Sequence, residues 1–166
     1  MKRETMRRKD RQVTEKEDIL PILKQADTCR IGFAVDNVPY IVCMNYGYEW
    51  GDEFPILYFH CAKEGRKLEF MKQNNYVCFQ LDTDHELEYI HEKVHCTMHY
   101  SSIVGMGFLE VVESEDERKK GLDLLMEHHD RPVPEKYPCG SMNRTLILKL
   151  KVTELTAKRN SKKTNE

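Results

Sequence analysis

Residues 29–48 read CRIGFAVDNVPYIVCMNYGY, and this stretch decides the fold. Cys29, Ile31 and Phe33 occupy every second position, which is the period of a β-strand with one buried face. Asp36 and Asn37 then supply a turn, and a second apolar run follows at once. The stretch therefore predicts an antiparallel β-hairpin.

The second arm of this hairpin, residues 39–48, is largely apolar on both faces. Val42 and Met44 lie on one face, whereas Ile41 and Cys43 lie on the other. Such a strand is expected where a barrel interior covers one face and a helix or a partner subunit covers the other.

Hydrophobic periodicity predicts the remaining elements. The predicted strands cover residues 56–60, 76–81, 94–108 and 145–155, and the predicted helices cover residues 14–26, 63–74 and 114–128. Thr14 with Glu17, and Ser114 with Glu117, form two capping-box patterns at helix starts. Pro21 lies inside the first helix, which is therefore either kinked or begins later.

The order of these elements indicates the fold class. The strands follow one another too often for a doubly wound parallel sheet. We predict a mainly β fold with helices (α+β), a small and mostly antiparallel barrel of about six strands with three helices.

The formal charge of the 166 residues is -2, but it is unevenly distributed. Residues 1–11 carry +4 and residues 158–166 carry +3, which leaves -9 for residues 12–157. We expect basic tails at residues 1–13 and 158–166 around one domain at residues 14–157. An acidic domain disfavours nucleic-acid binding, with a basic arm as the minor alternative.

Two further features concern the cellular setting. No uncharged apolar run approaches the roughly 20 residues of a membrane span, so we expect no membrane association and a cytoplasmic location. No two of the six cysteines lie closer than 14 positions, so we expect reduced thiols that mostly pack as small hydrophobes.

His91, His95, His99 and Cys96 resemble a metal-ligand cluster if the segment is a helix. The segment alternates with period two, however, and four residues of a strand span about 13 Å, too far for two histidines to share one ion. We therefore expect no metal site, and histidines that line the solvent face of a long strand.

The turn HCAKEGRK at residues 60–67 leads from a strand directly into a helix. Lys63, Arg66 and Lys67 converge where a helix start offers free backbone N–H groups, and small residues there allow an anion to approach. The turn is either a phosphate cradle or an ordinary basic first helical turn. Known nucleotide and nucleophile motifs, GxGxxG, GxxxxGK[ST] and GxSxG, are absent.

Four segments in this order resemble the pyridoxamine 5'-phosphate oxidase-related flavoproteins: RIGF (30–33), PYIVCMNYGY (39–48), LYFHCA with GRK (57–62 and 65–67), and YSSIVGMG (100–107). Within that superfamily the chain is most similar to the 5-nitroimidazole reductase (Nim) group. The likeness runs from about Thr14 to about Leu155. It implies a split β-barrel that binds FMN in a cleft between the two subunits of a homodimer.

The resemblance also implies the residues that contact FMN. They are Val42, Met44 and Asn45 along the ring, His60, Cys61, Ala62, Gly65, Lys67 and, as a weaker candidate, Arg66 at the phosphate turn, and Ser101, Ser102 and Val104 on the flavin's other side. The chain departs from its relatives at Cys43, where proline is usual, and at Cys61, where serine often contacts the phosphate.

The activity implied is that of an FMN-dependent oxidoreductase, which reduces a small organic acceptor such as a nitroaromatic by hydride transfer. His60 is the candidate catalytic residue, as a proton donor or a substrate contact. The alternative is a non-catalytic protein of the same fold that binds FMN or haem. A true pyridoxamine-phosphate oxidase is disfavoured, because its arginine-rich substrate motifs have no match here.

Overall fold

The computed structural model describes residues 6–91 and 94–161. These residues form two compact units. Unit 1 comprises residues up to 26 together with 81–104 and those from 156 onward, and unit 2 comprises residues 27–80 and 105–155. Three strands, β6 (Tyr76–Ile90), β7 (His95–Val111) and β8 (Thr145–Asn160), contribute residues to both units.

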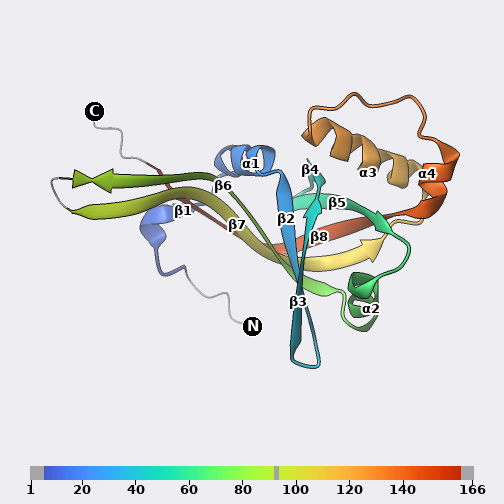
Figure 1. Cartoon of the computed structure of the whole chain (residues 1–166), viewed down its shortest axis with the longest axis horizontal. Helices are drawn as coiled ribbons and strands as arrows, with labels where there is room; N and C mark the ends of the chain where they lie inside the picture. The colour runs from blue at the N-terminus through green and yellow to red at the C-terminus, as the bar shows by residue number, and fades with distance from the viewer. Residues whose placement is uncertain (1–5, 92–93, 162–166) are drawn as a thin grey trace. The chain divides into compact units, whose positions relative to one another are not determined.

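The described residues form a single mainly antiparallel sheet with a few helices (Figure 1). The other strands are β1 (Gln12–Val13), β2 (Thr28–Val35), β3 (Val38–Asn45), β4 (Gly47–Trp50) and β5 (Pro55–Ala62). The strand order is β3-β2-β6-β7-β8-β5-β4, with β1 paired to β8. The predicted mainly β, antiparallel class is confirmed, with eight strands in place of about six.

The helices also exceed the three predicted. They are a 3-10 turn, η1 (Lys9–Arg11), followed by α1 (Lys16–Gln25), α2 (Arg66–Gln73), α3 (Glu115–His128) and α4 (Cys139–Arg144). The sequence did not indicate α4, because its six residues lie in a Pro-rich connection and are too few for a periodic pattern. None of the described helices is long and apolar enough to cross a membrane.

The predicted hairpin is present as β2 and β3. Their antiparallel register runs from Thr28↔Asn45 to Val35↔Val38. Asp36 and Asn37 form the two-residue turn with positive φ angles of 50° and 63°, values that Asp and Asn tolerate better than most residues.

The prediction of one strand over residues 39–48 is wrong, because the chain changes partner strand within it. β3 ends at Asn45 on β2, Tyr46 is fully buried, and β4 begins at Gly47 on β5. Gly47 is required here, since a Cβ would lie 2.4 Å from the backbone carbon of Leu124 in α3. The bend thus lets α3 pack directly on β4.

The core of unit 2 lies around β5. Leu57, Tyr58 and Phe59 are at most 1% exposed, so both faces of this strand are covered. Tyr58 packs with Ile147 of β8 and with Val112, and side chains of α3 close this cluster. β5 pairs with β8 from Ile56↔Lys151 to Ala62↔Thr145.

The N-terminus of α3 is anchored to the sheet by charged groups. Ser114 Oγ accepts a hydrogen bond from the Glu117 N–H at 3.5 Å, which confirms the predicted cap. The Glu117 carboxylate does not return to the cap, because it pairs with Lys149 Nζ and accepts from the Tyr58 hydroxyl. The hydrogen bond from Lys149 is the main reason why the pKa of Glu117 lies below its usual value.

The predicted capping box at the first helix is wrong. Thr14 Oγ1 bonds the neighbouring Glu15 carboxylate, and α1 begins at Lys16 with Glu15 at the N-cap position. The helix then continues through Pro21, which has no N–H to donate to the Glu17 carbonyl. The helix therefore does not begin late enough to keep the proline out of its interior. α2 likewise begins later than predicted, at Arg66 instead of Lys63.

Unit 1 extends further along the chain than the predicted domain boundaries. β8 continues to Asn160, beyond residue 157, and β1 pairs with it through Gln12↔Lys158 and Val13↔Ala157. Arg159 Nη2 donates to the Asp18 carbonyl at 2.9 Å. The inner parts of both predicted tails are therefore paired secondary structure. Residues 1–5 and 162–166 of those tails lie outside the described residues.

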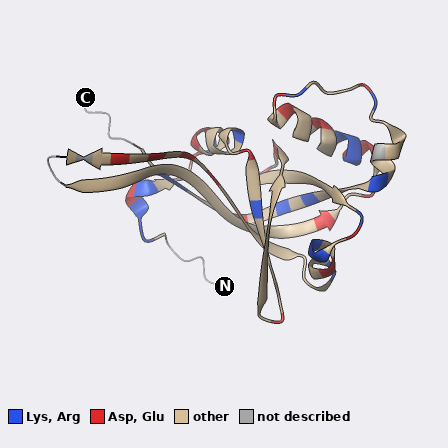
Figure 2. Cartoon of the chain, viewed as in Figure 1, with Lys and Arg blue, Asp and Glu red and all other residues tan. Residues whose placement is uncertain are grey.

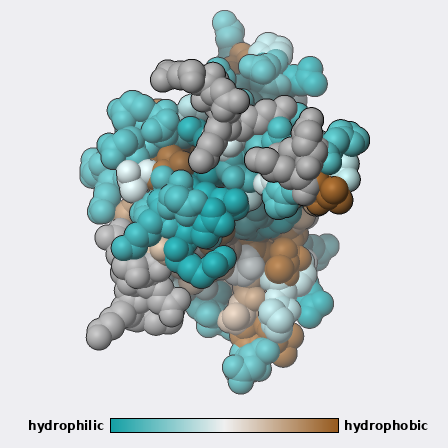
Figure 3. Space-filling view, turned by 90° about the vertical axis from the view of Figure 1, so that its left-hand side faces the viewer, coloured by the Kyte–Doolittle hydropathy of each residue, from teal (hydrophilic) through white to brown (hydrophobic). Residues whose placement is uncertain are grey.

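Charged residues are unevenly distributed along these elements (Figure 2). Acidic side chains recur on β6, α3 carries both signs, and the C-terminal part of β8 carries basic side chains. Hydrophobic side chains form small separate groups among hydrophilic ones on the face drawn in Figure 3.

The close contact at Gly47 gives a test of the fold. Gly47→Ala should lower the free energy of unfolding by about 1–3 kcal/mol, because the methyl group would overlap the α3 backbone. Urea denaturation would measure the change. Gly140→Ala is the matched control, since a Cβ there meets nothing within 4 Å and alanine favours the helix. Equal stability of the Gly47 variant and the wild type would contradict the packing described.

Candidate functional site

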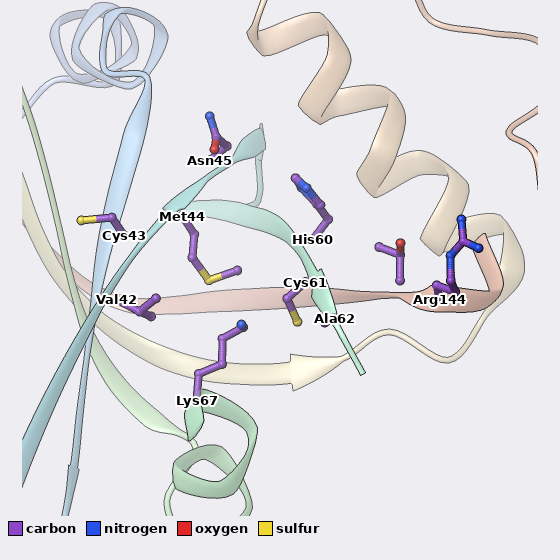
Figure 4. Close-up of a pocket in the computed structure, with 10 residues that line it drawn as sticks. Val42, Cys43, Met44, Asn45, His60, Cys61, Ala62, Lys67 and Arg144 are labelled. Atoms are coloured by element: carbon purple, nitrogen blue, oxygen red, sulfur yellow. The ribbon is translucent and has the colours of Figure 1, made fainter. Parts of the chain in front are cut away.

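A pocket of about 420 Å³ in unit 2 combines most of the residues expected at the phosphate turn with those expected along the ring (Figure 4). Its lining residues come from β3, β5, α2, α4 and β8: Val42, Cys43, Met44, Asn45, His60, Cys61, Ala62, Lys67, Arg144 and Thr145.

The β3 side of the pocket is a strand end with alternating burial. Met44 is buried opposite Cys29 of β2, whereas Cys43 and Asn45 are exposed. Val42 is half-buried. This side therefore offers a flat apolar surface at Val42 and Met44, next to an accessible amide at Asn45.

The β5 side consists of the last three residues of that strand. His60 and Ala62 are exposed and Cys61 is buried, and β8 holds all three through its first residues, with Ala62 opposite Thr145. Burial raises the pKa of the Cys61 thiol, and the charge of Lys67 offsets this only in part. Cys61 thus stays a neutral thiol at neutral pH and adds no negative charge to the pocket.

The turn after β5 delivers Lys67 to the pocket. Gly65 is the N-cap of α2 with a φ of +129°, which side chains with a Cβ rarely adopt. Its carbonyl accepts from the Leu68 N–H at 2.9 Å. Lys67 is the second residue of the helix, and its side chain reaches toward the space between Val42 and Cys61 (Figure 4).

The pocket carries two cations and no carboxylate among its lining residues. No described acidic side chain forms an ion pair with Lys67 or Arg144. Several lysines of unit 2 are paired instead, as in Lys120 with Glu49 and Lys149 with Glu117. In a chain whose body is acidic, this arrangement selects for an anionic ligand.

The structure brings together seven of the twelve residues that the resemblance implied: Val42, Met44, Asn45, His60, Cys61, Ala62 and Lys67. Gly65 and Arg66 do not line the pocket. Arg66 stacks over the rings of Tyr40 and Phe70, with 4.8 Å and 5.2 Å from its Cζ to the ring centroids.

The other three implied residues lie in unit 1 on β7. Ser101 is buried, and its Oγ has no hydrogen-bond partner among the described residues. Ser102 is half-buried and Val104 is exposed. None of the three lines the pocket.

Three lining residues were missed from the sequence: Cys43, Arg144 and Thr145. Cys43 lies between two residues that we expected at the site, so its position in the same strand could have indicated it. Arg144 and Thr145 reach the pocket only because β8 pairs with β5. No local pattern in the sequence indicates that pairing.

The histidines of the long strand differ from expectation in one respect. His95 is exposed, but His99 is buried, with Nδ1 3.0 Å from the Asn160 carbonyl and Nε2 2.7 Å from Glu88 Oε2. His91 lies before the strand begins. Within residues 6–91 and 94–161, no three His, Cys, Asp or Glu side chains are grouped so as to hold a metal ion.

Many solved structures are similar to this chain. A protein of Bacteroides thetaiotaomicron, provisionally described as a 5-nitroimidazole antibiotic resistance protein, is 32% identical with a TM-score of 0.77, and the match covers 89% of this chain and 86% of that one. A flavocytochrome from Azotobacter vinelandii is 16% identical with a TM-score of 0.76 and coverages of 95% and 72%. The FAD and haem binding protein from Mycobacterium smegmatis is 17% identical with a TM-score of 0.77 and coverages of 91% and 74%.

No curated protein sequence matches the chain significantly. The family model described as pyridoxamine 5'-phosphate oxidase matches residues 15–159, nearly the whole of the described chain. The open antiparallel sheet, the strand-turn-helix at the pocket and this match lead to one conclusion: the chain belongs to the pyridoxamine 5'-phosphate oxidase family and has its split β-barrel fold.

Proposed function

We propose that this chain is a flavoprotein that binds FMN in the pocket of unit 2 and reduces a small organic acceptor. The observation that carries the proposal is the pair of cations Lys67 and Arg144, which form no ion pair with a described carboxylate and lie beside Val42 and Met44 in a pocket whose lining residues include no carboxylate. A ligand with a flat apolar ring and an anionic end matches these two surfaces. The donor set therefore fits a flavin nucleotide.

Different residues of the pocket would bind different parts of such a ligand. Val42 and Met44 supply the flat apolar contact, and the Asn45 amide supplies a hydrogen-bonding partner for the ring edge. Lys67 neutralises the phosphate. A bound flavin supplies hydride transfer chemistry, and the protein supplies binding, orientation and electrostatics.

His60 is the proton-handling residue of the proposal. Its imidazole is exposed at the pocket, on the strand that ends at the phosphate turn. Imidazole is the side chain best suited to giving and taking a proton near neutral pH. No covalent nucleophile is needed, which agrees with a Cys61 thiol that burial keeps neutral.

The proposed acceptor is a nitroaromatic compound. Support comes from the protein of Bacteroides thetaiotaomicron, which is provisionally assigned to 5-nitroimidazole resistance and is similar to this chain over most of its length.

One alternative function has support from the solved structures. Proteins from Mesorhizobium loti and Mycobacterium smegmatis are described as FAD-binding, and another from Mycobacterium smegmatis binds both FAD and haem. The second candidate is thus a non-catalytic protein that holds a flavin or haem. An absorbance spectrum of the purified protein separates flavin from haem.

The proposal includes a homodimer. Met98, Val104 and Phe108 lie at even-numbered positions of β7, which share one face of the strand, and each is more than 40% exposed. Solvent exposure of this apolar row is unfavourable, and a second copy of the chain would remove it from water.

The phosphate assignment is tested by comparing FMN with riboflavin, which lacks the phosphate. Lys67→Gln should weaken FMN binding about 10- to 100-fold and leave riboflavin binding unchanged, because a charge-assisted contact is lost. Quenching of flavin fluorescence would measure both affinities. Lys72→Gln, an exposed lysine in the last turn of the same helix, is the control and should leave both affinities as in the wild type. The proposal fails if the wild type takes up neither flavin.

The role of His60 is tested with a reduced flavin loaded in advance, so that no electron donor has to be known. His60→Gln should keep FMN affinity within a few-fold but slow the reoxidation of bound reduced flavin by a nitroimidazole about 100-fold or more. Anaerobic stopped-flow absorbance would follow the reaction across pH. An unchanged rate and an unchanged pH profile would remove His60 from the reaction.

The dimer is tested by its mass. Sedimentation equilibrium should give twice the chain mass of 19.7 kDa for the wild type. Phe108→Lys should shift the equilibrium toward the monomer, because it places a charge in the apolar row. Val133→Lys, an exposed apolar position in the connection before α4, should leave the dimer intact. A wild type that stays monomeric at high concentration would refute this part of the proposal.

A further inference from the structure

Arg144 is the second cation of the pocket, and no sequence motif pointed to it. It is the last residue of α4, and the next residue, Thr145, begins β8 opposite Ala62 of β5. Arg144 therefore lies beside the end of β5, where the turn toward α2 starts. In Figure 4, Lys67 and Arg144 lie on either side of Cys61 and Ala62.

The backbone around Arg144 is held by a residue of another helix. Arg118 of α3 donates from Nη2 to the Met142 carbonyl at 2.7 Å and to the Thr145 carbonyl at 3.1 Å. These carbonyls lie before and after Arg144. The Met142 carbonyl also accepts from the Thr145 N–H at the C-terminal end of α4. The Arg118 guanidinium therefore lies at this helix end, where a positive charge is favourable.

The two arginines differ in their surroundings: Arg118 contacts the backbone, whereas Arg144 is open to a ligand. Arg118 is half-buried, and its Nη2 donates to two backbone carbonyls. Arg144 is exposed at the pocket and pairs with no described carboxylate. The Ala62↔Thr145 pairing and the Arg118 hydrogen bonds together fix where the Arg144 side chain leaves the backbone.

We propose that Arg144 binds a phosphate group of the nucleotide from the side of the β5 end opposite Lys67, and that Arg118 is the positioning residue that holds Arg144 there. The inference rests on the proposed function, since it takes the ligand to be a flavin nucleotide. The group recognised is a phosphate, either that of FMN or the second phosphate of a dinucleotide such as FAD. Guanidinium suits this role because its donors match two phosphate oxygens at once.

The test compares riboflavin, FMN and FAD as ligands of one variant. Arg144→Gln should weaken binding of at least one phosphorylated flavin about 10- to 100-fold, with riboflavin unchanged. Loss for FMN and FAD alike assigns Arg144 to the FMN phosphate, and loss for FAD alone assigns it to the second phosphate. Equal affinities for all three ligands in variant and wild type would overturn the proposal. Arg131→Gln, an exposed arginine of the connection before α4, is the matched control.

The positioning role of Arg118 is tested by a double-mutant cycle. Arg118→Gln should weaken binding of the same phosphorylated flavin in the wild-type background but add no further loss in the Arg144→Gln background. Arg118→Lys should restore part of the affinity, because one donor suffices for one carbonyl. Additive losses would show that Arg118 acts independently of Arg144, and would overturn its assignment. Thermal unfolding of each variant separates these effects from loss of the fold.

The same measurements separate this inference from the proposed function. If Lys67→Gln lowers FMN affinity and Arg144→Gln changes nothing, the flavin site stands and the assignment of Arg144 fails. If the wild type binds no flavin, the proposed function fails, and the assignment of Arg144 to a flavin phosphate fails with it.

Discussion

The antiparallel pairing of β5 with β8 is the constraint on which the pocket depends. It joins residues 55–62 to a strand that begins more than 80 positions later, and it ends where Ala62 meets Thr145. Beyond that pair, β5 leads through a turn into α2, which carries Lys67. β8 is preceded directly by α4, which carries Arg144. Two cations from distant parts of the sequence therefore flank one strand end. Leu57, Tyr58 and Phe59 are fully buried along this pairing, so both faces of β5 contribute to the core that holds the two strands together.

Electrostatics of unit 2 reinforce this geometry. Three acidic residues of α3 and β4 pair with lysines that do not line the pocket: Glu117 with Lys149, Glu49 with Lys120, and Asp123 with Lys119. The first two pairs join α3 to the sheet, and α3 in turn carries Arg118. The pocket keeps a net positive charge although residues 12–157 are acidic overall. Neither cation of the pocket pairs with a described carboxylate, so we expect an anion that binds there to stabilise the folded chain.

The parts of the candidate site that could be predicted from the sequence are those whose residues are neighbours along the chain. Residues 42–45 and 60–67 each form a short continuous segment, and most of the residues that we expected there line one pocket. Predictions from local sequence patterns failed where tertiary contacts determine strand pairing or burial. The strand predicted over residues 39–48 breaks at Tyr46 because β3 and β4 have different partners. His99 is buried, although alternation placed it on the solvent face, because Glu88 and the Asn160 carbonyl satisfy both of its nitrogens.

Arg66 and Arg144 show why charge alone does not identify a ligand residue. Arg66 stands next to Lys67 in a basic turn, yet one step along a helix rotates a side chain by about 100°, and its guanidinium stacks on Tyr40 and Phe70. Arg144 is isolated in a Pro-rich connection that carries no recognisable pattern, yet strand pairing brings it to the pocket. Of the two cations of the pocket, the local sequence indicates Lys67, whereas only the β5–β8 register reveals Arg144. Such a division is expected in antiparallel barrels, where neighbouring strands are often distant in sequence.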